Sequence, residues 1–175
     1  FASLLSEEFK STQSRRLGET LVINVPHSIL PPAYSAFAIA TRDKPFLVAS
    51  VTGELAALSV EMHALIHPIL DTPRTDKGRR SEKGKASAES YMLVVTARQS
   101  NASTRRIHAG LTETLADVDA VVADFDALRE ALGKSEQELS KVSAVKTDKA
   151  CEFLRWLYAG NFVLMGARRF DYREI

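Results

Sequence analysis

Two histidines whose spacing suggests metal binding, His63 and His67, lie in the segment of residues 59–70. Apolar and polar residues alternate along that segment, which predicts a strand with one apolar face. On a strand the two imidazoles share a face but lie about 13 Å apart, too far for a single metal ion. The sequence therefore predicts no metal site, and the side that carries the histidines is a candidate interface. Its members are Glu61, His63, Leu65 and His67, opposite the apolar Val60, Met62, Ala64 and Ile66.

Motifs for cofactor chemistry and for covalent catalysis are missing from the chain. It has no glycine-rich dinucleotide fingerprint, no phosphate loop with Gly-Lys-Ser/Thr and no nucleophile elbow. We therefore expect no catalytic residue and no cofactor within this chain. The single cysteine, Cys151, excludes an internal disulfide and is predicted to be a small buried group on a helix. Trp156 and Tyr158, in the same amphipathic segment, are predicted to be packing groups.

The turn at residues 41–45 is the stronger candidate for ligand binding. It joins a predicted strand to a predicted helix, and unpaired backbone N–H groups at a helix start attract carboxylates and other anions. The predicted effector site comprises Arg42, Asp43 and Lys44 with the backbone of Phe46 and Leu47. Two interpretations stay open: Asp43 receives the amino group of a ligand, or it simply caps the helix.

A basic segment at residues 74–85 could contact nucleic acid through phosphate. Its cations are Arg74, Lys77, Arg79, Arg80, Lys83 and Lys85. It lacks the interleaved aromatic residues that stack on bases, and Asp76 and Glu82 dilute its charge. A solvated hairpin connection is the favoured interpretation, and nucleic-acid binding is a remote alternative.

Composition is that of a folded globular chain of ordinary charge. Its 175 residues are 45% hydrophobic and 26% charged, with a formal net charge of +1. This balance gives no general attraction to nucleic acid or to an anionic membrane surface. No apolar run approaches the roughly 20 residues that span a bilayer, so we expect no membrane partner and a cytoplasmic location. Because the chain starts at Phe1 rather than at Met, we expect either a piece of a longer polypeptide or a chain that lacks an ordered start.

The elements that position these residues follow from the hydrophobic periodicity and the turn signals. Leu47, Val51, Leu55 and Leu58 form the apolar stripe of a helix that opens with Pro45, and Ile107, Leu111, Leu115 and Val118 form that of a second helix. Strands are predicted at residues 34–41, 59–70, 89–98 and 118–125, and helices at 45–58 and 101–118. This order is βαββαβ. It predicts an α+β, ferredoxin-like two-layer sandwich with two helices on one face of an antiparallel sheet.

Four segments organise the chain. Residues 1–33 are an N-terminal arm with a helix, carrying Leu4, Leu5 and Phe9 on one face, and an edge strand; residues 34–125 are the βαββαβ domain; residues 126–160 are a helical connector; and residues 161–175 begin a following β domain. The connector contains helices at 126–142 and 149–159, and the second ends at Gly160 and Asn161. Its buried stripe is Ala150, Phe153, Leu154 and Leu157.

The run RDKPFLVASVTGELAALSVEMHALIHPIL, residues 42–70, resembles the ACT type of regulatory module. More narrowly, the chain resembles the amino-terminal region of the large bacterial NAD-specific glutamate dehydrogenases. The resemblance rests on PFLVASV at residues 45–51, on His67 with Pro68, and on the aromatic-rich segment from Phe153 to Gly166. It spans residues 35–172. Ala49 departs from the family pattern, which favours Asp at that position.

This resemblance implies a noncatalytic regulatory or oligomerisation module of a long enzyme. The parent would oxidatively deaminate glutamate to 2-oxoglutarate with NAD, in a domain outside this chain. The implied partners are the rest of the parent polypeptide, further copies of the chain and a small amino-acid effector. A purely structural oligomerisation domain is the alternative.

Overall fold

The computed structural model describes residues 12, 15–16, 18–142, 147–168 and 170. These residues form two compact units, one ending at Val118 and the other starting at Asp119. In the first unit, the strands are β1 (Leu21–Asn24), β2 (Tyr34–Arg42), β3 (Met62–Ile66), β4 (Ile69–Arg74) and β5 (Lys85–Ala97). Its helices are η2 (His27–Ile29), α2 (Leu47–Ala57) and the first half of α3 (Asn101–Leu139). The predicted helix with Leu4, Leu5 and Phe9 lies outside the described residues.

The sheet is antiparallel, with β5 at its centre. The order is β1-β2-β5-β3, and β4 pairs with the other end of β5. β2 pairs with β5 over nine residues, from Tyr34 opposite Ala97 to Arg42 opposite Glu89. Because β5 has partners on both sides along its length, its register fixes the positions of three other strands.

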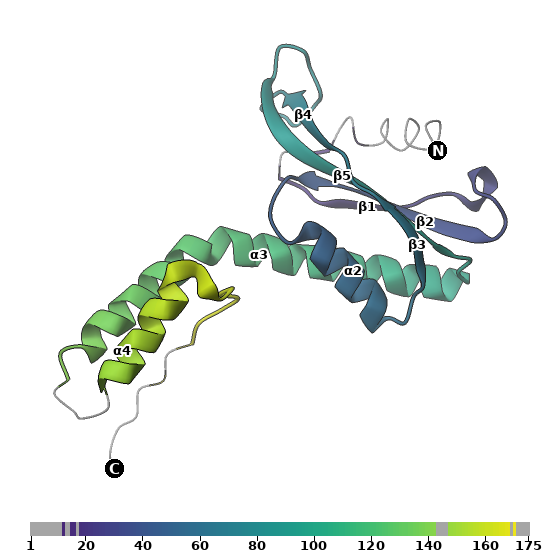
Figure 1. Ribbon diagram of the computed structural model, residues 1–175. Coiled ribbons are helices and arrows are strands. Elements are labelled where there is room, and N and C mark those ends of the chain that lie inside the picture. The colour runs from purple at the N-terminus through teal and green to yellow at the C-terminus, as the bar shows by residue number, and fades with distance from the viewer. Residues whose placement is uncertain (1–11, 13–14, 17, 143–146, 169, 171–175) are drawn as a thin grey trace. The chain divides into compact units, whose positions relative to one another are not determined.

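The two faces of the sheet are covered differently. α2 and α3 lie along one face (Figure 1). Their buried residues, Leu47, Val51 and Leu55 on α2 and Ile107, Leu111, Leu115 and Val118 on α3, are the predicted stripes except for Leu58. On the opposite face a smaller core contains Val25, Ala36, Leu93 and Val95. The predicted α+β class, an antiparallel sheet with helices on one face, is confirmed.

The predicted strand at residues 118–125 is wrong, because α3 continues without a break through that segment. Val118, Val121 or Val122, and Phe125 recur at a spacing of three to four, so they extend the apolar stripe of the helix. The valines of this segment are typical of strands, and they favoured the wrong assignment. The place beside β2 is taken instead by β1, which pairs with it antiparallel from the N-terminal side of the chain. The βαββαβ order therefore becomes ββαβββα.

The predicted strand at residues 59–70 is divided at His67 and Pro68 into β3 and β4, and both pair with β5. A bulge between Met62 and Ala64 also breaks the alternation, since Met62 lies opposite Thr96 whereas Ala64 lies opposite Val95. Neighbouring residues of β5 point to opposite faces, so Met62 and Ala64 do not share the single apolar face that was predicted. The long hairpin after β4 is confirmed.

The second unit consists of the end of α3, α4 (Thr147–Trp156) and the π-helical turn η3 (Leu157–Asn161). Cys151 is buried, as predicted. The predicted buried stripe is only partly right, because Leu154 and Leu157 are half-buried while Ala150 and Phe153 are exposed. Trp156 is also 49% exposed, and it stacks on Phe153 rather than packing inside. No strand occurs in the described part of the last segment, residues 162–168 and 170, contrary to prediction.

Replacing Gly84 by Ala is expected to destabilise the first unit. A Cβ at Gly84 would lie 2.3 Å from the backbone carbonyl carbon of Arg74, which cannot yield as a side chain would. We expect a loss of about 1 to 3 kcal/mol in the free energy of unfolding, measured by urea denaturation. The matched variant is Gly53→Ala on α2, where the new Cβ meets nothing within 4 Å and stability should rise by up to about 1 kcal/mol. Equal effects of both variants would contradict the close approach.

Candidate effector site

The turn between β2 and α2 differs in detail from its prediction. α2 begins at Leu47, and Phe46 is the capping residue, with a left-handed φ of 72° and no side-chain hydrogen bond to the helix start. Pro45 therefore precedes the helix rather than opening it. Asp43 is not the cap, so that interpretation of its role is excluded. Leu47 is buried in the core, whereas Arg42 and Phe46 are exposed and Lys44 is partly so.

Asp43 is held by β5 through its backbone and its side chain. Its N–H donates to the carbonyl of Ala88 over 2.9 Å. Its carboxylate oxygen Oδ1 accepts a hydrogen bond of 2.5 Å from the hydroxyl of Ser90, which is fully buried. The Ser90 oxygen also lies 3.0 Å from Nε2 of His67. One residue of the predicted effector site and one of the predicted interface are thus joined through a residue that sequence analysis did not select.

The direction of these hydrogen bonds is fixed by the proton count. A serine hydroxyl has one proton, and that of Ser90 goes to Asp43. His67 must therefore donate from Nε2 to the Ser90 oxygen. A catalytic serine needs the opposite arrangement, in which an imidazole accepts the hydroxyl proton. The chain of Asp43, Ser90 and His67 consequently serves position rather than nucleophilic attack.

The four predicted interface residues do not form one outward surface. Leu65 lies opposite Val94, on the face that α2 and α3 cover, and it is half-buried. His67 is engaged with Ser90 on that same side. His63 is exposed, and its ring meets the ring of Tyr34 edge-on at 5.5 Å. Glu61 is exposed, and its carbonyl accepts from the N–H of Ala97.

A buried cluster of charges lies on the other face of β5, around Glu89. Glu89 Oε1 accepts from Nη2 of Arg15 at 2.6 Å and from Nε of Arg74 at 2.5 Å. Its Oε2 accepts from Nη2 of Arg74 at 2.8 Å and from the hydroxyl of Tyr91 at 2.6 Å. Arg74 also donates to the carbonyls of Thr12 and Arg15. Glu89, Arg15 and Arg74 are each no more than 3% exposed, so the cluster ties the N-terminal arm to the hairpin.

The protonation state of Glu89 is set by competing effects. Burial alone would raise the pKa of its carboxyl, but hydrogen bonds from Arg74 and Tyr91 and the charges of Arg15 and Arg74 hold that pKa below its usual value. The same hydrogen bond raises the pKa of Arg74 despite its burial. Glu89 is therefore ionised at neutral pH, and its charge is matched inside the fold.

This cluster corrects the prediction of a solvated basic loop. Arg74 is 2% exposed and belongs to the cluster, and Arg80 donates to the hydroxyl of Tyr91 at 2.5 Å. The Arg80 guanidinium also lies 5.3 Å from the centre of the Tyr91 ring. The remaining cations, Lys77, Arg79, Lys83 and Lys85, are exposed. Two of the six cations are thus committed to the fold.

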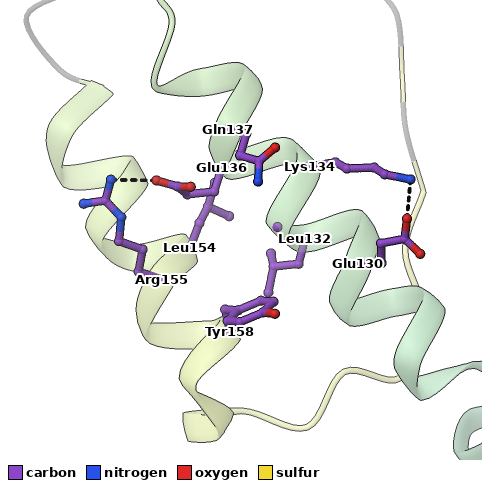
Figure 2. A pocket seen from close by; sticks show the side chains of 9 residues that line it. Glu130, Leu132, Lys134, Glu136, Gln137, Leu154, Arg155 and Tyr158 are labelled. Carbon is purple, nitrogen blue, oxygen red and sulfur yellow. Dashed lines mark ion pairs between the residues drawn. The ribbon is translucent and has the colours of Figure 1, made fainter.

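A groove in the second unit is a hollow that a small molecule could enter. It measures about 540 Å³ and is lined by Leu132, Leu154 and Tyr158 between the end of α3 and α4 (Figure 2). Arg155 pairs with Glu136 across it at 2.7 Å. Lys134 pairs with Glu130 at 2.6 Å. Because its charged side chains already satisfy one another, the groove has less to offer a charged ligand than the turn at Asp43.

Comparison with known proteins connects this site to a family. The family model of the glutamate dehydrogenase ACT1 domain matches residues 27–111, which include Asp43, His67, Glu89 and Ser90. The chain is 30% identical over 154 residues, 81% of its length, to an NAD-specific glutamate dehydrogenase of Halomonas elongata. The chain belongs to the NAD-specific glutamate dehydrogenase family. Its residues 27–111 correspond to the ACT1 domain of that family.

Two further relatives are also described as NAD-specific glutamate dehydrogenases. The Pseudomonas aeruginosa protein is 30% identical over 150 residues, or 79% of this chain. The Mycobacterium tuberculosis protein is 28% identical over 187 residues, or 95% of this chain. The chain spans only 9% to 11% of the length of these three glutamate dehydrogenases.

Within the described ranges, no group of three or more His, Cys, Asp or Glu side chains is arranged to hold a metal ion. Across the same residues, no helix is both long and apolar enough to cross a membrane.

The residues that sequence analysis missed are Glu89 and Ser90. Both stand at the start of the run ESYMLVV, where two polar residues open an otherwise apolar strand. A charged residue inside a buried strand needs a partner, and this signal was available. The identity of the partners was not, because Arg15 and Arg74 lie 74 and 15 residues away along the chain.

Replacing Glu89 by Gln is expected to cost about 3 to 5 kcal/mol of unfolding free energy at pH 7, because two buried arginines lose their counter-charge. The pKa of Glu89 is lower in the folded chain, so its contribution is complete above about pH 4.5 and disappears as the pH falls through the folded value. The difference between wild type and variant should therefore shrink in acid, as measured by denaturation at a series of pH values.

The matched variant is Glu130→Gln, which removes a carboxylate from an exposed pair with Lys134. It should leave the free energy of unfolding unchanged within the error of the measurement. A Glu89→Gln variant as stable as this control at pH 7, or a difference that grows in acid, would contradict the role of the cluster.

Proposed function

We propose that this chain is a noncatalytic regulatory module of an NAD-specific glutamate dehydrogenase and that it binds an amino-acid effector at the turn between β2 and α2. The parent reaction is the NAD-dependent oxidative deamination of glutamate to 2-oxoglutarate. NAD and the reacting glutamate bind elsewhere in the parent polypeptide. The names of the three relatives and the match to the ACT1 domain support this proposal.

The observation that carries the proposal is the unsatisfied start of α2 beside a fixed carboxylate. Phe46 provides no side-chain cap, so the first N–H groups of α2 can donate to an anion. Asp43 lies three residues earlier and is held in place by Ser90. A helix start that favours a carboxylate, together with an aspartate that favours an ammonium group, suits the two charged ends of an α-amino acid. Arg42, exposed at the end of β2, can add to the attraction for the carboxylate.

Assembly of subunits is the second candidate function, and β3 is the feature that favours it. β3 pairs with β5 on one side, and its other side carries no further strand among the residues that the structure describes. Met62 on this edge is 38% exposed. An open strand edge with an exposed apolar side chain is a common place for association with another chain. A second copy could therefore join there.

Amino-acid binding predicts a thermal shift that depends on Asp43. An amino acid at about ten times its Kd should raise the Tm of the chain by about 3 to 6 °C. Asp43→Ala should abolish this shift relative to its own Tm, because the ammonium group loses its partner. Differential scanning fluorimetry with each of the protein amino acids measures this shift.

Asp76→Ala is the control for this screen, since Asp76 is exposed in the hairpin between β4 and β5, beyond the end of β4 at Arg74. It should keep the full shift. No shift with any amino acid, or identical shifts in the wild type and in Asp43→Ala, would remove the sensing role.

Assembly through β3 predicts self-association that Met62→Lys weakens by at least tenfold, because a charge would be placed at the strand edge. Sedimentation velocity over a concentration series measures it. Ile29→Lys on η2, a similarly exposed position, should have no effect. A monomer at every concentration, or equal effects of both substitutions, would count against assembly through this edge.

A further inference from the structure

We propose that Ser90 couples the turn at Asp43 to the kink between β3 and β4 at His67, so that a change at one of them affects the other. The chain of atoms runs from Asp43 Oδ1 to the Ser90 hydroxyl over 2.5 Å and from there to His67 Nε2 over 3.0 Å. Asp43 and His67 are far apart in the sequence, and one buried hydroxyl joins them. The coupling concerns the fold itself, and its regulatory consequence rests on the proposed effector site.

The backbone places both ends of this chain on the same short piece of β5. The N–H of Asp43 donates to the carbonyl of Ala88, and the N–H of Tyr91 donates to the carbonyl of Pro68, over 2.9 and 3.0 Å. Ser90 lies between these two anchors. A shift of the turn relative to β5 therefore strains the hydrogen bond of Ser90 to Asp43 before it disturbs any distant element.

Burial makes the coupling energetic as well as geometric. Ser90 is 0% exposed, so water cannot replace a lost partner. A buried hydroxyl that loses one partner keeps the full cost of its desolvation. Because the single proton of Ser90 points to Asp43, the oxygen is available as an acceptor for His67, and each bond polarises the other. Removal of either end therefore weakens the hold on the other.

For the proposed effector site, this coupling gives a route by which ligand binding at the turn can affect His67. A ligand ammonium group that binds the carboxylate of Asp43 competes for it with the Ser90 hydroxyl. The effect reaches His67, which lies at the junction of the two strands that form this side of the sheet. Effector occupancy at the turn would then alter the position of the kink, and with it the edge that β3 offers to a partner.

A double-mutant cycle tests the coupling without any ligand. Asp43→Ala, His67→Ala and their combination are compared by urea denaturation in the wild-type background and again in Ser90→Ala. In the wild-type background the change in the unfolding equilibrium constant for the pair should differ from the product of the single changes by about threefold or more. In the Ser90→Ala background the two changes should multiply within error. Independent changes in the wild type, or equal coupling without Ser90, would overturn the proposal.

The tautomer of His67 provides a test that requires no destabilised variant. Nitrogen NMR of the imidazole should show neutral His67 protonated at Nε2, with the resonance assigned by its loss in His67→Gln. A neutral ring protonated at Nδ1 would overturn the proposal, because Ser90 would then donate to His67 and the bond to Asp43 would be broken.

These results separate the coupling from the proposed function. Independent changes in the cycle with a retained amino-acid response at Asp43 would reject the coupling alone. A coupled cycle with no response to any amino acid would reject effector binding alone.

Discussion

The buried carboxylate of Glu89 is the constraint on which the rest of this fold depends. It brings together an arginine from the N-terminal arm and an arginine from the end of β4, and it stands on the strand that every other strand but β1 pairs with directly. A charge in this position is costly to bury unless all of its oxygens are satisfied. Here four donors satisfy them, so the register of the hairpin and the position of the arm are specified together.

Neighbouring residues on a strand point to opposite faces, and β5 uses this alternation to separate two tasks. Glu89 faces the N-terminal arm and closes that side of the sheet. Ser90 faces the side covered by α2 and α3, where it holds Asp43 at the proposed effector site. The dipeptide Glu89-Ser90 thus fixes both the attachment of the N-terminal arm to one face of the sheet and the geometry of the turn. Under the proposed function, this arrangement would let a small ligand at the turn act on strands that it does not contact.

Sequence periodicity was sufficient for the stripes of α2 and α3, apart from Leu58, and for most strands, because burial of one face leaves a direct mark on residue order. The stripe of Ile107, Leu111, Leu115 and Val118 is buried as predicted. It was insufficient at 118–125, where valines typical of a strand also fit the apolar stripe of a continuing helix. The bulge after Met62 and the left-handed Phe46 escaped because each depends on backbone geometry that pairing and packing impose from outside the segment.

The turn that carries the proposed effector site was predictable from the sequence, but the hydrogen bonds that hold it were not. The turn between strand and helix, with Asp43, follows from local signals. The engagement of Asp43 by Ser90, and of Arg74 by Glu89, arises from contacts between residues 47 and 15 positions apart. Residue type alone assigned Arg74 to solvent, since arginine is seldom buried without a partner and the partner could not be identified from one sequence.

The central claim, that the turn between β2 and α2 receives an amino-acid effector, is tested most directly by a map of amide chemical shifts in the 175-residue chain as each amino acid is added. The account predicts saturable changes that begin at Asp43 and the first residues of α2, Leu47 to Ser50, and extend to Ser90 and His67. Saturable changes confined to the groove at Leu132, Leu154 and Tyr158 in the second unit would contradict it.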